Sequence, residues 1–374
     1  MRLRNFLFIY FILLGLLSCS DDDKYENSGD DIITPEPGAS RGLYILSEGG
    51  WGRNEASLTY YDYDSGNYTN DYFGWVNPNE GVLGDVGNDI NIYGSKMYAV
   101  INNSNYVEVM EAKTAKHLGK IQIPNCRSVT FDKGYAYVSS FAGTPQSNNS
   151  QLGTIVKIDT TNLSIVNNVS VGYQPEEMTV VNDKLYVANS GGYTPESYDT
   201  TVSVIDLSSF QEVKKIDVGA NLWKIKADKN NNIWVTSRGN YNDIKPFISI
   251  IDPNTDTVIK TITATITGFD FYENNLYYYG TDYDSANKTV NSYGIIDINT
   301  QNKISSHIMN ENTESQIVVP YGIIINPDNG DIFIADARDY QISGKIFCIN
   351  KNGILKWVRN AGVSPGHFTF LTKK

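Results

Sequence analysis

Residues 176–218 read EEMTVVNDKLYVANSGGYTPESYDTTVSVIDLSSFQEVKKIDV, and this stretch holds four strand-like segments in succession. Apolar and polar residues alternate in the outer segments, which is typical of half-buried strands. The pair Asn182-Asp183 forms a tight turn, whereas a long loop separates the second segment from the third. We expect one antiparallel sheet, whose innermost first strand is buried on both faces. The expected strands are residues 176–181, 184–188, 202–206 and 212–218.

The second of these strands contains a short phrase that returns along the whole chain at steps of 39 to 56 residues. A strand-rich unit repeated at this period predicts an all-β, seven-bladed β-propeller with four antiparallel strands in each blade. The seven copies are Leu43-Tyr44-Ile45, Met97-Tyr98-Ala99, Ala136-Tyr137-Val138, Leu185-Tyr186-Val187, Ile233-Trp234-Val235, Leu276-Tyr277-Tyr278 and Ile332-Phe333-Ile334.

The two ends of this repeated region complete each other. The repeats begin at Leu43 with a second strand, so the first blade lacks its innermost strand. The C-terminal segment Pro365–Leu371 matches the first-strand pattern of Pro320–Ile325. The sequence therefore predicts that the C-terminal strand closes the ring by completing the first blade, so that residues 42–374 form one domain.

The strand phrases Lys184–Asn189 (KLYVAN), Val202–Asp206 (VSVID) and Ile216–Gly219 (IDVG) resemble the YVTN, or YncE-like, family of β-propellers. The resemblance extends over residues 42–371 and implies the propeller fold. It implies no activity, because propellers carry many different functions.

The first eighteen residues are predicted to be a signal peptide. Arg2 and Arg4 precede an apolar run that is too short to remain as a membrane-spanning helix. The run ends in Leu16-Leu17-Ser18-Cys19, which resembles the lipobox of bacterial lipoproteins and implies lipidation of Cys19. The alternative is an ordinary signal peptide with an incidental cysteine.

Residues 19–41 are expected to form a flexible, acidic tether. Ser20-Asp21-Asp22-Asp23 resembles the export signal that gut-dwelling Gram-negative bacteria place after a lipidated cysteine. The resemblance implies an outer-membrane lipoprotein that faces the cell exterior. The alternative is an acidic linker that only solvates the chain.

Charge and cysteine content exclude several classes of function. The full chain has a net charge of −12, and without residues 1–18 it has 28 basic and 42 acidic residues, a net charge of −14. This balance disfavours nucleic acids and anionic lipids as partners. Cys126 and Cys348 belong to blades that are not adjacent, so we expect buried thiols rather than a disulfide.

The long loops are expected to share one face of the propeller, because connections between second and third strands and between successive blades emerge on the same side. Long loops on a rigid scaffold commonly bind ligands, although their aromatic residues could instead pack beneath their own loops. The loops are residues 47–56, 74–86, 139–152, 189–200, 237–246, 280–292 and 336–343. The candidate ligand contacts on this face are Trp51, Trp75, Phe141, Tyr193, Tyr198, Arg238, Tyr241, Tyr283, Arg338, Tyr340 and His367.

The opening pairs of the first strands should ring the mouth of the central channel. His367 is the one histidine expected there, so no metal site is predicted. Glu176 and Glu177 are consecutive and should point to opposite faces of their strand, which does not make an acid/base pair. We therefore expect no enzyme and no cofactor, with a lyase using His367 and Glu177 as the alternative. The pairs are Asn88-Asp89, Arg127-Ser128, Glu176-Glu177, Trp223-Lys224, Thr267-Gly268, Tyr321-Gly322 and Gly366-His367.

The whole organisation, with a lipobox, an acidic tether, a propeller and a loop face rich in Tyr and Asn, resembles the BtuG-type lipoproteins of gut bacteria. That resemblance implies binding of cobalamin (vitamin B12) or a related corrinoid and transfer to a TonB-dependent outer-membrane transporter. The alternative is a propeller that binds a glycan or another protein. For a glycan, Trp51 flanked by Glu48 and Glu55 would be a suitable platform.

Overall fold

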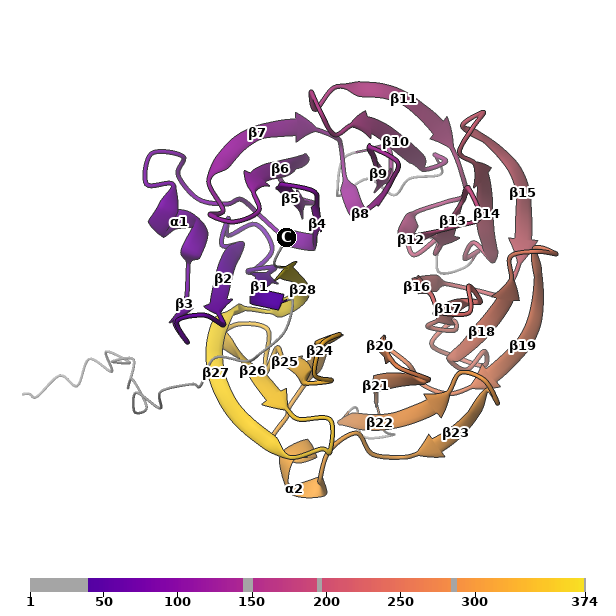
Figure 1. Ribbon diagram of the computed structural model, residues 1–374. Helices are drawn as coiled ribbons and strands as arrows, with labels where there is room; N and C mark the ends of the chain where they lie inside the picture. Colours follow the sequence, from indigo (N-terminus) through magenta and orange to yellow (C-terminus); the bar gives the residue numbers. More distant parts are fainter. Residues whose placement is uncertain (1–39, 144–150, 194–196, 284–287, 373–374) are drawn as a thin grey trace, which may run out of the picture. The chain divides into compact units, whose positions relative to one another are not determined.

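Seven four-stranded antiparallel sheets surround a central opening in the computed structural model (Figure 1). The structure describes residues 40–143, 151–193, 197–283 and 288–372. The predicted seven-bladed β-propeller is therefore confirmed. The predicted signal peptide, Cys19 and almost all of the predicted tether lie outside the described residues, whereas Ser40 and Arg41 belong to the first strand.

The blades follow one another along the chain, apart from the closing strand β28. Blade 1 consists of β28 (Pro365–Thr372), β1 (Ser40–Ser47), β2 (Ser57–Asp62) and β3 (Tyr68–Thr69); blade 2 consists of β4 (Gly87–Tyr93), β5 (Lys96–Ile101), β6 (Tyr106–Glu111) and β7 (His117–Gln122). Blade 3 consists of β8 (Cys126–Asp132), β9 (Tyr135–Ser140), β10 (Thr154–Asp159) and β11 (Ile165–Ser170); blade 4 consists of β12 (Pro175–Val181), β13 (Lys184–Asn189), β14 (Thr201–Asp206) and β15 (Gln211–Asp217); blade 5 consists of β16 (Leu222–Ala227), β17 (Ile233–Ser237), β18 (Phe247–Asp252) and β19 (Thr257–Thr263). Blade 6 consists of β20 (Gly268–Tyr272), β21 (Asn275–Tyr283), β22 (Thr289–Asp297) and β23 (Asn302–Ser305); blade 7 consists of β24 (Pro320–Ile325), β25 (Ile332–Asp336), β26 (Ser343–Ile349) and β27 (Leu355–Val363).

The second strand of each blade is the most deeply buried one. All five residues of β17 and of β25 are buried, and β5, β9 and β13 are buried except at their first residue. In each of the innermost strands β4 and β16, two buried positions are separated by two half-buried ones, and the remaining positions are half-buried. The expectation that the innermost strand is buried on both faces is therefore wrong. Each second strand is covered on both faces by neighbouring blades. Each innermost strand borders the channel, so some of its side chains are only partly covered.

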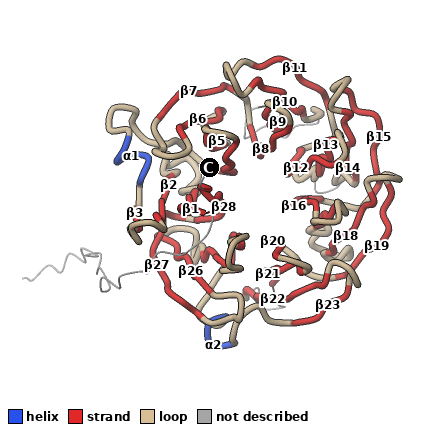
Figure 2. Tube along the Cα trace, viewed as in Figure 1, coloured by secondary structure: helices blue, strands red, loops and turns tan. Residues whose placement is uncertain are grey.

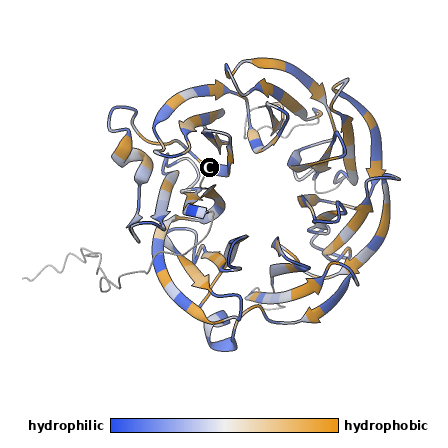
Figure 3. Cartoon of the chain, viewed as in Figure 1, coloured by the Kyte–Doolittle hydropathy of each residue, from blue (hydrophilic) through white to orange (hydrophobic). Residues whose placement is uncertain are grey.

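The outer strands show the opposite pattern. β19 alternates strictly between exposed and half-buried residues, and β11 is exposed at nearly every position. Figure 3 shows the same alternation as hydrophobic and hydrophilic bands along β15 and β19. In β19 one face is partly covered and the other meets water, which preserves the period of two in the sequence.

The ring closes as predicted, because β28 pairs antiparallel with β1. Leu43 lies opposite Phe370, and Ile45 lies opposite Phe368. Phe368 and Leu371 are buried. The C-terminal strand thus supplies the channel-facing edge of the blade that the N-terminal strands begin.

Two expected loops contain regular structure instead (Figure 2). The segment expected as a loop over residues 74–86 begins within helix α1 (Tyr72–Val76), and β21 and β22 extend into the segment expected as a loop over residues 280–292. The second helix, α2 (Glu311–Glu314), lies in the connection between blades 6 and 7. Neither helix in the described part of the chain is long and apolar enough to span a bilayer.

A recurrent aspartate ends the third strand of several blades and shapes the turn that follows. The carboxylate of Asp206 accepts a hydrogen bond from the backbone N–H of Ser209 at 2.8 Å, and Asp159 accepts one from Thr161 at 2.7 Å. Hydrogen bonds from the hydroxyl of Ser208 and from Ser209 lower the pKa of Asp206 to about 2. Such local bonds favour a turn over a continued strand. Cys126 and Cys348 are both buried thiols that form no disulfide with each other, as predicted.

Deleting residues 365–374 tests the closure. This deletion removes β28, so the apolar surface of β1 and of blade 7 that β28 covers becomes exposed. Losing two or more large buried side chains costs several kcal/mol, so we expect the melting temperature measured by circular dichroism to fall by about 10 °C or more. A chain that lacks only residues 373–374 keeps β28 and is the control. Equal melting of both chains would contradict the closure.

Candidate functional site

The first strands begin around the mouth of the central channel, on the face of the long loops. At least one member of each predicted opening pair lines either the channel or its mouth, which confirms the predicted ring. We call the hollow at this mouth the mouth cavity. It measures about 470 Å³, and the residues that characterise it are Glu48, Trp51, Arg127, Glu176, Lys224 and His367.

Glu176 connects three blades at this mouth. Its carboxylate lies 3.0 Å from Nη2 of Arg127, which is on blade 3, and 3.4 Å from Nη2 of Arg238, which follows β17 on blade 5. Arg127 also donates a hydrogen bond to the side chain of Asn88 on blade 2, at 2.7 Å. Burial would lower the pKa of Arg127, but the charge and hydrogen bonds of Glu176 outweigh burial and raise it. Arg127 therefore stays cationic and fixed in position.

Glu177 points into the channel and takes different partners. Nζ of Lys224 lies 2.5 Å from its carboxylate. Deeper in the channel, Nζ of Lys226 pairs with Asp270 at 3.0 Å. Burial would raise the pKa of Glu177, but the charges of Lys224 and Lys226 outweigh burial and hold that pKa below its usual value.

Glu176 and Glu177 both line the mouth cavity, although consecutive residues of a regular strand face opposite sides. The pairing of β12 with β13 shifts register between Pro175 and Met178, so the alternation is broken at this point. The two carboxylates bind different cations, since Glu176 pairs with Arg127 of blade 3 and Glu177 pairs with Lys224 of blade 5.

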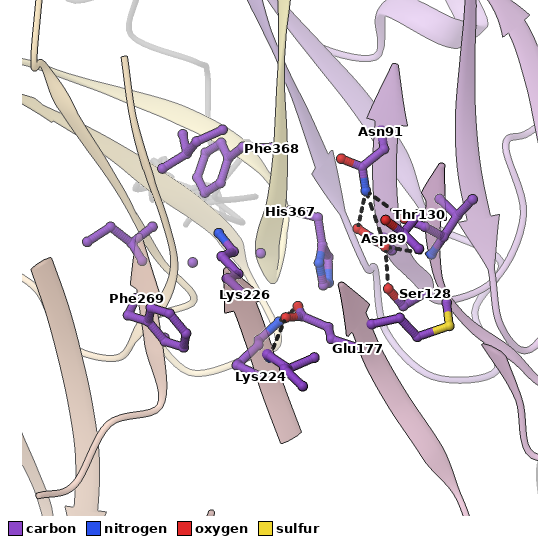
Figure 4. A pocket seen from close by; sticks show the side chains of 18 of the residues that line it. Asp89, Asn91, Ser128, Thr130, Glu177, Lys224, Lys226, Phe269, His367 and Phe368 are labelled. Carbon is purple, nitrogen blue, oxygen red and sulfur yellow. Dashed lines mark hydrogen bonds and ion pairs between the residues drawn. The ribbon is translucent and has the colours of Figure 1, made fainter. Parts of the chain in front are cut away.

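His367 and Asp89 lie on the wall of the channel near its mouth (Figure 4). Nε2 of His367 lies 3.3 Å from the carboxylate of Glu48, which also accepts a hydrogen bond from the hydroxyl of Tyr321 at 2.9 Å. Asp89 accepts hydrogen bonds from Ser128 Oγ at 2.7 Å and from a backbone N–H at 2.9 Å. Burial raises the pKa of Asp89 despite these donors.

Aromatic rings support the arginines of the mouth. The guanidinium of Arg238 lies 4.1 Å from the ring centroid of Trp223, and that of Arg127 lies 4.9 Å from the ring of Phe141. Phe141 is only 3% exposed and contacts Tyr193 edge to face. Such cation–π contacts hold a charged group in place while leaving its N–H groups able to donate.

The structure divides the candidate contact residues into groups. Trp51, Phe141, Tyr193, Arg238 and His367 line the mouth cavity. Tyr241 and Tyr340, again with Arg238, line a second hollow beside it. Tyr198 and Arg338 line neither of these hollows, and the side chain of Tyr283 lies outside the described residues.

Trp75 lies away from both hollows. It belongs to α1, which packs on β2 at the outer edge of the ring (Figure 1). The side chain of Asn77, at the end of α1, donates a hydrogen bond to the carbonyl of Ala115 at 2.9 Å. Ala115 lies in the turn between β6 and β7, which is on the face opposite the long loops. Trp75 is 70% exposed there.

Two residues that join the hollows were absent from the candidate contacts. Trp223 and Tyr321 line both of them. The sequence placed both residues in the ring of opening pairs, but the candidates were chosen by loop position. Their aromatic character at ring positions is the signal that could have identified them.

A seven-bladed β-propeller with a polar, aromatic-rimmed hollow at the channel mouth is the class of protein that these observations define. Residues 41–353 match the model of a family described as Domain of unknown function (DUF5074). The chain belongs to this family. No curated protein matches the chain.

Solved structures share the fold at low identity. Hydrazine synthase of Kuenenia stuttgartiensis is 13% identical, with a TM-score of 0.61, over 77% of this chain and 90% of that chain. A quinonprotein alcohol dehydrogenase-like protein of Bacteroides thetaiotaomicron is 16% identical, with a TM-score of 0.60, over 88% of this chain and 78% of that chain. These likenesses establish the propeller fold and carry no activity to this chain.

The ion pair between Glu176 and Arg127 can be tested with a double-mutant cycle. Both side chains are mostly buried, at 7% and 19% exposed. Glu176→Gln leaves the Arg127 charge without its partner, which should cost about 3 kcal/mol of unfolding free energy. In the background of Arg127→Met the same change should cost less than half as much. Equal costs in both backgrounds, measured by urea unfolding, would show that the pair contributes no coupling.

The pairing of Glu177 predicts a pH dependence of stability. The pKa of Glu177 is lower in the folded protein than its usual value of about 4.3 in an unfolded chain. Its stabilising effect is therefore complete above that value and is lost as the pH falls through the lower, folded pKa. We expect the wild type to lose more melting temperature between pH 5 and pH 3 than Glu177→Gln does. The control is Glu55→Gln, at an exposed site, which should follow the wild type, and a Glu177→Gln profile parallel to the wild type would refute the assignment.

Proposed function

We propose that this protein is a lipid-anchored binding protein of the outer membrane, facing the cell exterior, that captures cobalamin or a related corrinoid at the mouth cavity. In this proposal Cys19 carries the anchor, and a TonB-dependent transporter receives the ligand. The observation that carries the proposal is the composition of the mouth cavity, where paired charges and aromatic rings from several blades meet.

The pairing of charges favours a ligand that is large, polar and nearly neutral. Four carboxylates in the mouth cavity lie among three cations and a histidine. Because all of these groups except Asp89 pair with one another, they present hydrogen-bonding edges without a strong net field. A corrinoid is broad and is rimmed with amides, which both donate and accept hydrogen bonds. Arg127 and Lys224 would donate to amide carbonyls, while the carboxylate of Glu176 would accept from amide N–H groups.

Aromatic residues supply the apolar part of the proposed contact. Trp51 is 51% exposed at the rim, and Trp223 lies against Arg238 within the cavity. Exposed rings of this kind cover apolar ligand surface with little loss of side-chain freedom. The long loops would thus cover the faces of the macrocycle and the ring of opening pairs would hold its polar rim.

We propose binding rather than catalysis for the same set of residues. A lyase would need a free base beside His367, but Glu177 is held by Lys224 and has a lowered pKa. His367 itself lies beside Glu48. General acid/base chemistry works best with a pKa near the working pH, and this pairing moves Glu177 in the opposite direction.

Cyanocobalamin binding by matched tryptophan variants tests the proposal. We expect the wild type to be stabilised by about 2.7 kcal/mol when cyanocobalamin is present at a hundredfold excess over its dissociation constant. Trp51→Ala should weaken binding about tenfold by calorimetry, because it removes an aromatic contact. Trp75→Ala removes a more exposed ring, 70% against 51% for Trp51, from the outer edge and should bind like the wild type.

Two outcomes would overturn the proposed function. The first is an unchanged melting temperature of the wild type in a large excess of cyanocobalamin. The second is a stabilisation by a neutral glycan, but not by cyanocobalamin, that depends on Trp51. The second outcome would favour the glycan platform formed by Trp51 and Glu55 instead.

A further inference from the structure

A second hollow opens beside the mouth cavity, between the long loops of blades 5, 6 and 7. It measures about 560 Å³, and we call it the side cavity. Its position next to the channel sets it beside the mouth cavity. The residues that characterise it are Trp223, Arg238, Tyr241, Ile244, Thr281 and Tyr340.

The two cavities have a common wall. Trp223, Arg238 and Tyr321 line both of them. The guanidinium of Arg238 lies over the ring of Trp223 at 4.1 Å and pairs with Glu176 on the side of the mouth cavity. A group bound in either cavity therefore contacts residues that also contact a group in the other.

The lining of the side cavity differs from that of the mouth cavity. The mouth cavity is dominated by ion pairs, whereas aromatic and small polar side chains dominate the side cavity. Tyr241 is 72% exposed and Tyr340 is 39% exposed. Exposed rings beside threonine hydroxyls suit a planar ring that stacks on its faces and forms hydrogen bonds at its edge.

The backbone at these two tyrosines supports a role in binding. Tyr241 has a φ of 58° and Tyr340 a φ of 63°, in the left-handed region that costs an L-residue about 1 kcal/mol or more. Among the described residues, Phe210 is the only other aromatic residue with a positive φ, and its burial offsets the strain. Tyr241 and Tyr340 remain substantially exposed, and the ring of Tyr340 contacts that of Tyr321 edge to face.

Two polar atoms in the wall also lack partners. Nε of Arg238 and Oγ1 of Thr281 are buried, and neither has a hydrogen-bond partner among the described residues. Buried polar groups of native proteins are nearly always paired. A ligand with a polar edge could pair these atoms after small side-chain adjustments.

We infer that the two cavities form one bipartite site, in which the polar body of the ligand lies over the mouth cavity and a planar aromatic group of the same ligand occupies the side cavity. This inference rests on the proposed function. For a corrinoid, the planar group is the heteroaromatic base of the nucleotide arm, and the polar body is the amide-rimmed macrocycle. The side cavity would then distinguish complete corrinoids from those without a base.

Cyanocobalamin and dicyanocobinamide, which lacks the nucleotide arm, separate this inference from the proposed function. We expect the wild type to bind both, and to bind cyanocobalamin at least tenfold more tightly by calorimetry. Tyr241→Ala should weaken cyanocobalamin binding about tenfold, the effect of one lost stacking contact, and leave dicyanocobinamide binding unchanged. Tyr241→Ala combined with Tyr340→Ala should remove most of the preference between the two probes.

The control variant is Tyr173→Ala, because Tyr173 is a 38% exposed tyrosine on the same face that lines neither cavity. It should bind both probes like the wild type. Equal wild-type affinity for the two probes, or equal weakening of both by Tyr241→Ala, would overturn the bipartite site and leave the proposed function standing. Failure of the wild type to bind either probe would overturn both.

Discussion

The pairing of β28 with β1 is the constraint on which the rest of this molecule depends. It joins the two ends of the described chain in one sheet and holds seven blades at a common distance from the channel. Each second strand is buried because a neighbouring blade covers each of its faces. Without this closure, two blades would each lack a neighbour on one side, and the apolar faces on that side would be exposed to water.

The closed ring also determines the charges at the channel mouth. Arg127, Glu176 and Arg238 come from three successive blades and are far apart in the sequence. They are neighbours because first strands converge on the channel axis. Their mutual pairing lets a strongly acidic chain present a hollow in which most charges are paired, and this pairing is the basis for proposing a nearly neutral, amide-rich ligand.

The same geometry separates the mouth cavity from the side cavity on the long-loop face. Arg238 is held between Glu176 on one side and Trp223 beneath it. It therefore forms a fixed partition between the mouth cavity and the side cavity. The proposed ligand chemistry follows from this partition, because each side presents a different kind of lining.

The repeats, the closing strand and the ring of opening pairs could be predicted from the sequence because they are local or periodic features. A strand phrase that returns every 39 to 56 residues needs no knowledge of distant contacts to be recognised. The same holds for the long-loop face, since the order of strands in a blade dictates on which side each connection emerges. The errors arose where packing overrides the local pattern, as in α1 and in the extended hairpin of β21 and β22.

By itself, then, the sequence determined that this protein is a closed seven-bladed β-propeller with one face of long loops. The alternation of apolar and polar residues in strands and the recurrence of one four-stranded unit are both local patterns of the sequence. Only the tertiary structure decided which candidates meet, placing Trp51 and His367 at the mouth, Tyr241 and Tyr340 beside it, and Trp75 far away. The physical reason is that those placements depend on the curvature of the ring and on contacts between residues of different blades, and neither has a local signature in the sequence.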